Sequence, residues 1–388
     1  MDFSLSLEQQ QIRDAMFKLC APFDDGYWLA KDKTGEFPHE FRAALAQAGW
    51  LGIAMPEEFG GADLGVTGAA IMMQAIAESG AAMSGASAVH INIFGLQPVV
   101  MLGTDEQKRR MLPPLIAGKD KACFAVTEPD AGLDTTAIKV RAERRGDHYL
   151  LSGQKIWIST SQVANKILIL VRTTPLDRVE RKTEGLSLFY TDLDRSRVVV
   201  RPIDKMGRHA VDSNEMFFDA MPVPAADLIG AEGQGFRAIL HGMNPERILI
   251  AAEAVGIGRA AVQRAAKYAQ ERVVFRRPIG QNQGIAHPLA RCWIDLEAAN
   301  LMVMKAAALY DRGMECAAEA NAAKYLAGEA AFQACETAVM THGGMGYSKE
   351  FHVERYLREV MIARIAPITP HMILNFIAEK VLGMPKSY

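Results

Sequence analysis

The chain has 388 residues, an apolar fraction of 49% and a formal net charge of −2. This length and apolar content suit a globular protein of two or three domains and exclude a disordered chain. The charge is nearly balanced, and the basic clusters at residues 108–110 and 276–277 are short. We therefore expect neither nucleic acid nor an anionic membrane as a partner.

Cysteines, histidines and apolar runs narrow the class further. The five cysteines are widely spaced and form no C-x-x-C pair, which favours reduced thiols and a cytoplasmic location. Residues 1–16 lack a basic segment followed by an apolar one, so no signal peptide is expected, and neither is a run of roughly 20 apolar residues that spans a bilayer. No H-E-x-x-H motif occurs, so no metal site is predicted.

Residues 1–120 show helical signals. Leu7, Ile12 and Met16 recur at helical spacing and predict a first amphipathic helix. His90 and Asn92 interrupt a later apolar stretch, where we expect a satisfied polar pair in the core, with a substrate contact as the alternative. Further helices are expected around residues 41–48, 71–76, 90–101 and 105–116.

From residue 121 to about residue 233 the pattern changes to short β-rich runs separated by turn signals. The dipeptide Gly146-Asp147 is typical of a hairpin turn. We predict a small antiparallel β domain. Its strands are expected at residues 122–126, 138–143, 148–151, 155–158, 166–171, 186–191, 198–203 and 216–218.

Residues 234–388 return to helix. Alanine-rich tracts there have high helix propensity and predict four long helices in a bundle. Residues 256–261 (GIGRAA) match a dinucleotide-binding fingerprint, but no strand precedes them, so we interpret them as a helix-packing contact. The chain is thus predicted to be an α+β protein with a helical domain (1–120), a β domain (121–233) and a helical bundle (234–388).

One central stretch would suit a flat aromatic cofactor. Residues 123–135 are CFAVTEPDAGLDT, and SGQKIWIST follows from residue 152. Backbone groups and a hydroxyl near Val126 and Thr127 can bond the polar edge of a ring, while Trp157 can cover an apolar face. We expect the side chains of Ser159 and Trp157 to point to the same face of the sheet, because side chains alternate along a strand with period two. Taken singly, a Thr-Glu-Pro turn and a tryptophan in a strand are ordinary structural features.

Together these motifs resemble the acyl-CoA dehydrogenase family, whose FAD-dependent members place a double bond between the α and β carbons of acyl-CoA thioesters. The resemblance extends over nearly the whole chain. It implies the family's three-part fold, bound FAD, an acyl-CoA substrate, electron-transferring flavoprotein as electron acceptor, and a homotetramer that shares FAD sites between subunits. It does not imply integral membrane association.

The resemblance also implies which residues contact FAD. By spacing alone, the glycine loop HGGMGYSKE is either a connecting turn or a point of close ligand approach, and Arg272 is an exposed charge at a helix end. In the family both segments reach the cofactor, with Arg272 at the pyrophosphate. The FAD contacts carried over are Phe124, Val126, Thr127, Trp157, Ser159, Arg272, Phe275, Gln283, Gly344 and Thr369.

The family's reaction needs a carboxylate base with a raised pKa to remove the α proton. Many members carry it near the C-terminus, where this chain has Pro367. Isovaleryl-type and long-chain-type members carry it early in the first long bundle helix, where this chain has Glu246 followed by Arg247. Asn244, Pro245 and Glu246 are also typical of a helix start. The missing C-terminal glutamate favours Glu246 as the base, with Arg247 orienting it or lining the pocket.

Alternatives with the same fold are an oxidase that uses oxygen, a desulfinase-like flavoprotein and a non-catalytic partner subunit. Retention of Glu246 disfavours chemistry without a base, and retention of Thr127, Trp157 and Arg272 disfavours a scaffold. The acyl chain stays open between short branched, terpenoid, aromatic and straight medium chains. Positions that depart from the family's usual residues are Leu133, His209, Met340, Pro367 and His371.

Overall fold

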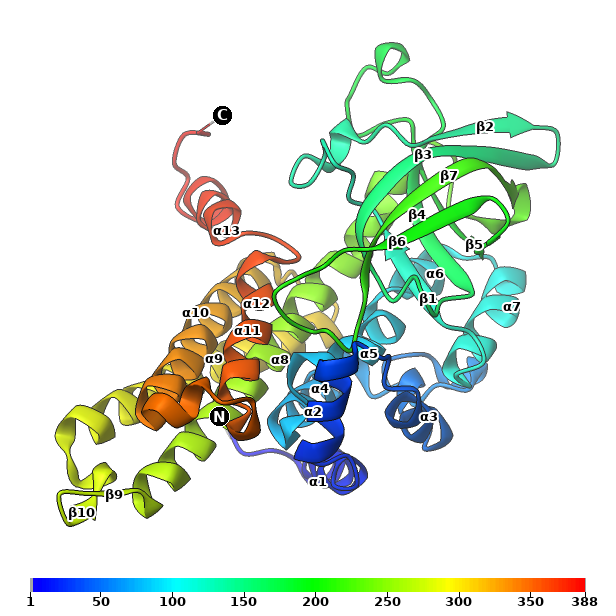
Figure 1. Cartoon of the computed structure of the whole chain (residues 1–388). Helices are drawn as coiled ribbons and strands as arrows, with labels where there is room; N and C mark the ends of the chain where they lie inside the picture. The colour runs from blue at the N-terminus through cyan, green and yellow to red at the C-terminus, as the bar shows by residue number, and fades with distance from the viewer. Residues whose placement is uncertain (1–2, 388) are drawn as a thin grey trace.

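The N-terminal part of the chain is helical, as the apolar spacing predicted. The computed structural model describes residues 3–387 (Figure 1). The first helix starts at a capping box, in which the side chains of Ser6 and Gln9 each accept a hydrogen bond from the other's backbone N–H. The helices are α1 (Leu7–Cys20), α2 (Asp25–Thr34), α3 (His39–Gln47), α4 (Gly65–Ile76), α5 (Ala82–Phe94), α6 (Gln97–Leu102) and α7 (Asp105–Ile116).

Helix α2 is absent from the sequence prediction because the face that it buries is partly polar. Its buried residues are Trp28, Lys31 and Asp32. The side chain of Asp24 caps its first turn, and Gly35 ends it with a φ of 70°. Trp28 is the one apolar residue among those that α2 buries, so apolar spacing does not reveal the buried face without the tertiary partners of Lys31 and Asp32.

Two helical stretches are long and apolar enough to cross a membrane by composition alone, contrary to the expectation that no such run exists. The first, Gly65–Leu102, is 72% buried in its most apolar window and runs through the protein core. It bends at Gly80, whose φ of 103° favours glycine. The second, Val353–Val381, is interrupted between Ile365 and Pro370. Both stretches therefore meet the length and composition of a membrane span while they form core and surface helices of this protein.

The middle of the chain forms one sheet with the strand order β6-β7-β3-β2-β4-β5-β8, and β1 pairs with β4. Most pairings are antiparallel, but β1 and β4 run parallel, and so do β2 and β4 at one residue pair. The prediction of a purely antiparallel domain is wrong there, because the β2–β3 hairpin lies between β1 and β4 in the chain and brings β4 back in the direction of β1. The strands are β1 (Ala122–Ala125), β2 (Arg141–Arg145), β3 (His148–Ser159), β4 (Lys166–Arg172), β5 (Leu186–Asp192), β6 (Val198–Pro202), β7 (Ser213–Pro224) and β8 (Leu228–Ile229).

The C-terminal part contains long helices, but not the four long helices predicted. Helices α8, α9 and α10 are long, whereas the fourth position is taken by two short helices, α11 and α12. Gly256 lies in the middle of α8, where an added Cβ would come within 2.3 Å of the Gln74 carbonyl oxygen on α4. This close approach confirms the helix-packing interpretation of GIGRAA. The elements are α8 (Gly235–Glu271), β9 (Val273–Val274), β10 (Arg277–Pro278), α9 (Gln283–Asp311), α10 (Ala317–His342), α11 (Val353–Val360), α12 (Ile362–Ile365) and α13 (Pro370–Phe376).

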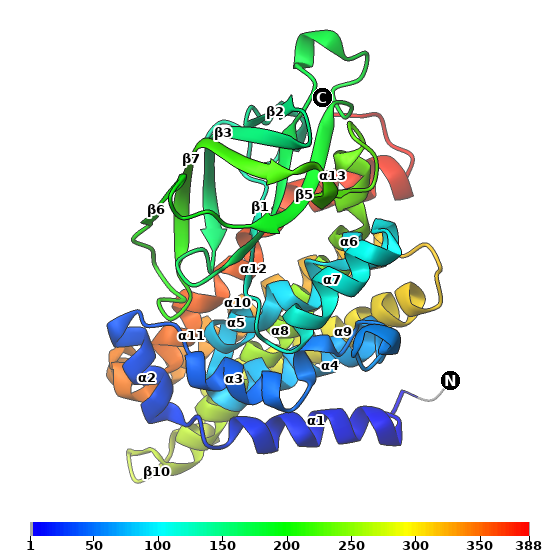
Figure 2. The same cartoon turned by 90° about the vertical axis from the view of Figure 1, so that its right-hand side faces the viewer.

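The two helical parts share one hydrophobic core. Phe41 and Ile71 from the N-terminal helices belong to the same buried cluster as Leu249 and Leu296 from the bundle. The sheet packs onto α6, α7 and the first turns of α8 in a second buried cluster (Figure 2). The three-part α+β architecture is confirmed, and the helices form one rigid support beneath the sheet.

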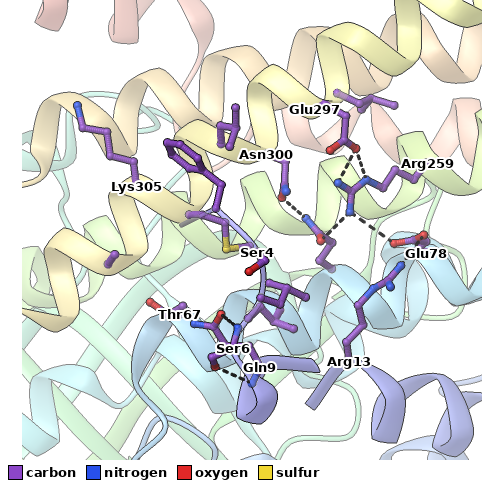
Figure 3. A pocket seen from close by; sticks show the side chains of 18 of the residues that line it. Ser4, Ser6, Gln9, Arg13, Thr67, Glu78, Arg259, Glu297, Asn300 and Lys305 are labelled. Atoms are coloured by element: carbon purple, nitrogen blue, oxygen red, sulfur yellow. Dashed lines mark hydrogen bonds and ion pairs between the residues drawn. The ribbon is translucent and has the colours of Figure 1, made fainter. Parts of the chain in front are cut away.

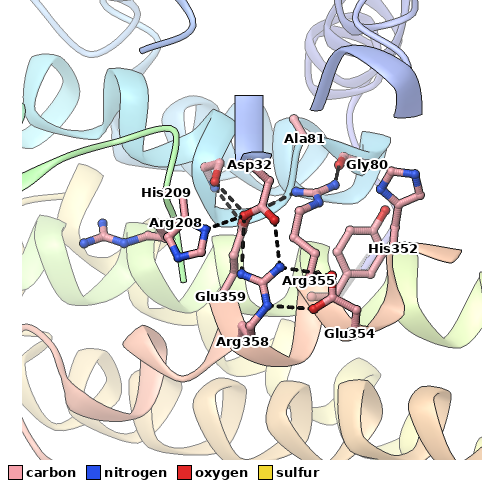
Figure 4. Close-up of polar contacts among 12 residues, drawn as sticks. Asp32, Gly80, Ala81, Arg208, His209, His352, Glu354, Arg355, Arg358 and Glu359 are labelled. Atoms are coloured by element: carbon pink, nitrogen blue, oxygen red, sulfur yellow. Dashed lines mark hydrogen bonds and ion pairs between the residues drawn. The ribbon is translucent and has the colours of Figure 1, made fainter. Parts of the chain in front are cut away.

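Buried ion pairs join the three parts near α11 (Figure 4). The carboxylate of Asp32 accepts a hydrogen bond from Arg358 Nη2 at 2.8 Å and lies 3.1 Å from His209 Nδ1, in the loop before β7. Burial opposes the charge on Asp32, but the hydrogen bond and charge of Arg358 hold the pKa of that carboxyl below its ordinary value. This junction explains why α2 buries a carboxylate.

Candidate active site

Glu246 lies inside a helix and not at its start. Because α8 begins at Gly235, Pro245 is an internal residue, and the predicted helix start at Asn244 is wrong. Proline has no N–H for the carbonyl of residue 241, four positions earlier. The hydroxyl of Tyr310 donates to that His241 oxygen at 3.5 Å. A partner from α9 thus compensates the gap immediately before Glu246.

The carboxyl of Glu246 is buried and poised near neutral pH. Its Oε2 has no hydrogen-bond partner among the described residues. Burial raises its pKa from 4.5 to about 7, helped by the charge of Glu253 and opposed by those of His90 and Arg247. Arg247 itself is held by Asn244, whose Oδ1 accepts from Arg247 Nη1 at 3.0 Å. A group with these properties can accept a proton from a bound molecule.

The pKa of Glu246 predicts the pH dependence of turnover. Only the ionised carboxylate can take a proton, so kcat/KM should rise about tenfold per pH unit up to about pH 7 and then level off. Steady-state assays at low substrate concentration would record this profile. They would cover about pH 5 to 9, with roughly one measurement per half pH unit. A flat profile through pH 6 to 8, or a fall as pH rises, would contradict this role for Glu246.

A buried ion pair, which the sequence prediction missed, holds the loop at Val126 and Thr127. Lys155 Nζ donates to the Val126 carbonyl at 2.7 Å and to Glu128 Oε1 at 2.9 Å. The backbone N–H of Ile156 donates to the Thr127 carbonyl at 3.0 Å. Glu128 also accepts from the backbone N–H groups of residues 139 and 140. Little signal for this pair was available in the sequence, because Glu128 and Lys155 stand among other polar residues in both motifs.

Trp157 departs from the regular strand geometry on which its prediction rested. It has a φ of 62°, and the register of β3 on β7 shifts between Lys155 and Ile158. Lys155 is fully buried whereas Trp157, two residues later, is 55% exposed. The bulge therefore interrupts the alternation between Lys155 and Trp157, and the common side expected for Trp157 and Ser159 stays a prediction. The bulge presents the indole to solvent beside the Val126–Thr127 loop, where a planar group can stack on it.

Aromatic and electrostatic contacts connect this loop region with Glu246. The rings of Phe124 and Phe94 lie 5.4 Å apart, and Phe94 lies 4.7 Å from His90. His90 in turn interacts electrostatically with Glu246. The structure thus brings Phe124, at the end of β1, to the same region as the predicted base on α8.

Thr369 is connected to Arg247 through Lys324. Its hydroxyl caps α13 by accepting from the N–H of Met372. The preceding carbonyl of Ile368 accepts a hydrogen bond from Lys324 Nζ at 2.5 Å. Lys324 is close enough to Arg247 for the two charges to interact. Thr369 therefore belongs to the Glu246 side of the molecule.

The remaining predicted FAD residues lie elsewhere. Arg272 ends α8, Phe275 lies in the β9–β10 hairpin, Gln283 starts α9 and Gly344 follows α10. Figure 1 shows this hairpin at the far end of the bundle from the sheet. Phe275 is 95% exposed there. One chain does not bring this group together with Trp157 and Glu246.

The pair predicted between His90 and Asn92 is wrong. His90 Nδ1 bonds Glu253 Oε1 on α8 at 2.5 Å, and Asn92 Nδ2 has no partner in residues 3–387. The period of α5 explains the difference, because residues two apart on a helix point in different directions. His90 therefore faces α8, where the sequence prediction did not place it.

A large cavity lies outside this region (Figure 3). It has a volume of about 1080 Å³ and lies between the N-terminal segment, α4, α8 and α9. Arg259 in its wall bonds Glu297 and Gln74, which also bonds Asn300. None of the predicted catalytic or FAD-binding residues lines it. The cavity therefore belongs to a different surface from the one that Glu246 faces.

The residues present suit FAD. An exposed indole beside a backbone loop can hold a flat ring, and exposed Arg272 can bind a pyrophosphate. Family models of the N-terminal, middle and C-terminal domains of acyl-CoA dehydrogenases match residues 6–119, 123–221 and 233–382. Fold and site thus define a flavoprotein oxidoreductase that binds FAD.

Full-length relatives agree with this class. The chain is 38% identical to acyl-CoA dehydrogenase FadE12 of Mycobacterium tuberculosis, over 100% of this chain and 99% of that protein. The structure of butyryl-CoA dehydrogenase from Megasphaera elsdenii is similar, with a TM-score of 0.93 and 28% identity over 98% of this chain and 100% of that one. The structure of a glutaryl-CoA dehydrogenase in complex with glutaryl-CoA is also similar, with a TM-score of 0.94 and 30% identity over 100% of this chain and 98% of that one. The chain belongs to the acyl-CoA dehydrogenase family.

Proposed function

We propose that this chain dehydrogenates an acyl-CoA thioester between its α and β carbons, with Glu246 as the base. The observation that carries the proposal is the unpartnered Oε2 of Glu246, on a carboxyl whose pKa burial raises to about 7. Bound FAD supplies the acceptor for the hydride that leaves the β carbon. Glu246 takes the α proton, and Arg247, held by Asn244, orients the carboxylate.

The chain's other residues position the reactants. Val126, Thr127 and Ser159 supply backbone groups and hydroxyls for the polar edge of the flavin, and Trp157 covers one face. Thr369 contributes a hydroxyl from the α13 side. Lys155 and Glu128 fix the Val126–Thr127 loop, which supports a rigid flavin site. Positioning of this kind would bring the α carbon of one bound substrate to the base and its β carbon to the hydride acceptor.

The visible spectrum of the purified flavoprotein tests the reaction. Anaerobic addition of a panel of acyl-CoA thioesters should bleach the flavin with at least one of them. Electron-transferring flavoprotein should then restore the colour faster than air does, since we propose it as the acceptor. Fast recovery in air would identify an oxidase instead, and a flavin that no thioester bleaches would contradict the proposal.

We propose that each FAD site is completed by a second copy in a homotetramer. The separation of Arg272 and Phe275 from Trp157 supports this, because one chain cannot supply both ends of the site. Exposed apolar residues on α9 and beyond α12 also support contact between copies. They are Trp293, Ile294, Leu301, Leu374, Val381 and Leu382.

Arg272→Ala should weaken FAD binding about 10- to 100-fold, because a charge-assisted contact to phosphate is lost. Fluorescence titration of the apoprotein with FAD measures this. Mixing Arg272→Ala with Glu246→Gln chains gives a sharper test at limiting FAD. If the site is shared, mixed oligomers contain one intact site and regain activity. No recovery after verified subunit exchange would place Arg272 in its own chain's site.

We also propose a cytoplasmic location. All five cysteines are unpaired and buried, which supports a reducing compartment.

A further inference from the structure

A buried histidine–carboxylate pair lies beside the proposed base and has no part in the reaction described above. His90 on α5 and Glu253 on α8 are joined by the bond between Nδ1 and Oε1, and Glu253 is fully buried. Glu253 follows Glu246 by seven residues, so both lie on one face of α8, roughly 10 Å apart along the axis. The charges of both carboxylates act on His90.

The hydrogen bonding of this cluster is incomplete. Oε2 of Glu253 and Oε2 of Glu246 are buried without a partner in the described chain. Buried polar atoms are normally hydrogen-bonded, and leaving one unbonded destabilises the protein. The structural pair in the β domain differs, because both carboxylate oxygens of Glu128 are bonded. These two unpartnered carboxylate oxygens, one of them on the base itself, indicate a place where another molecule supplies contacts.

The imidazole of His90 has one nitrogen left for that molecule. Nδ1 is bonded to Glu253, Nε2 has no bond to any described residue, and the side chain keeps 16% of its exposure. Phe94 packs on the ring and continues to Phe124, a predicted flavin contact. Burial disfavours the charge, yet Glu253 and Glu246 raise the pKa of His90, and nearby Arg208 opposes them. The charged ring offers an Nε2–H donor.

We propose that His90, held by Glu253, is a specificity residue that binds an uncharged oxygen on the acyl chain beyond the β carbon. A hydroxyl or oxo oxygen accepts from Nε2–H, whereas a carboxylate would find the charge of His90 already neutralised by Glu253. This inference rests on the proposed function, because it requires that the acyl chain of a bound substrate extend from Glu246 toward His90. It assigns a substrate class, namely acyl-CoA thioesters that carry a hydroxyl or oxo group on the chain.

Matched acyl-CoA thioesters of equal length test the assignment through kcat/KM for flavin reduction. The first acyl chain is an unsubstituted alkyl chain, called the plain chain. The second and third carry a hydroxyl and an oxo group, respectively, on the carbon next to the chain end. The fourth acyl chain ends in a carboxylate. The wild type should prefer the hydroxyl or oxo chain over the plain chain by at least about tenfold. Equal rates, or preference for the plain or carboxylate chain, would overturn the assignment. Failure of every thioester to reduce the flavin would instead count against the proposed function.

Variants locate the preference. His90→Leu should remove it while plain chains are still oxidised, and Glu253→Gln should reduce it and serves if the first variant does not fold. The control is Glu78→Gln, a buried carboxylate paired with Arg13 and Arg259 on a different surface, which should keep the wild-type preference. An unchanged preference in both His90→Leu and Glu253→Gln would overturn the role of the pair.

Discussion

Glu246→Gln should lower the rate of flavin reduction by about 10²–10⁴-fold, with FAD still bound. The amide has nearly the shape of the carboxyl but cannot accept the α proton. Pro367 stands at the family's other base position and cannot replace it. Stopped-flow absorbance with a saturating acyl-CoA measures the rate, and the flavin spectrum reports the bound cofactor. Wild-type reduction rates in this variant would exclude Glu246 as the base.

Stability gives the control for that variant. The folded pKa of Glu246 lies near 7, above its ordinary 4.5, so the folded protein binds more protons than the unfolded one between these values. Stability contributed by this group is therefore complete below pH 4.5 and is lost as pH rises to about 7. The loss amounts to about 3 kcal/mol. Glu246→Gln should not show this loss of stability and should be at least as stable as the wild type at pH 8. A loss of activity in this variant can then not be attributed to unfolding.

Lys155→Met should destabilise the protein by about 3–5 kcal/mol and release FAD. Glu128 would remain buried without its cation, and the Val126 carbonyl would lose its donor. Urea unfolding measures the stability, and flavin retained on a desalting column measures the binding. The loop that the pair holds should relax, so FAD should be lost at urea concentrations below global unfolding.

Two further variants make this result specific. Lys139→Met removes an exposed ion pair with Asp130 in the same loop and should change stability by less than about 1 kcal/mol. Lys155→Met combined with Glu128→Gln removes both buried charges and should recover part of the stability. Equal losses for Lys139→Met and Lys155→Met would show that the buried pair has no special role.

The sequence carries the fold largely through local patterns. The apolar spacing of α1, the alanine-rich bundle helices and the β-rich centre are each set by residues close in the chain, so they are predictable. Gly256 is readable in the same way, because a small residue in a long helix marks close packing. The features that the sequence did not predict depend on residues far apart in the chain. Helix α2 is one of them, because it buries Asp32 against Arg358, more than three hundred positions away.

The same difference between local patterns and long-range contacts separates the predicted from the unpredicted features of the candidate site. Glu246 was identified by its position in a family motif, although Pro245 made it resemble a helix start. The bulge at Trp157 and the Lys155–Glu128 pair arise from how β3 meets its neighbours, which period-two reasoning does not contain. His90 was read as a core residue because its partner, Glu253, lies on another helix.

The most direct measurement is a single anaerobic turnover in which flavin absorbance and the mass of the acyl-CoA are followed together. We expect each reduced flavin to yield one thioester lighter by two hydrogen atoms, and Glu246→Gln to yield none on the same timescale. Flavin reduction without that product, or the product at wild-type rate in the variant, would contradict dehydrogenation by Glu246.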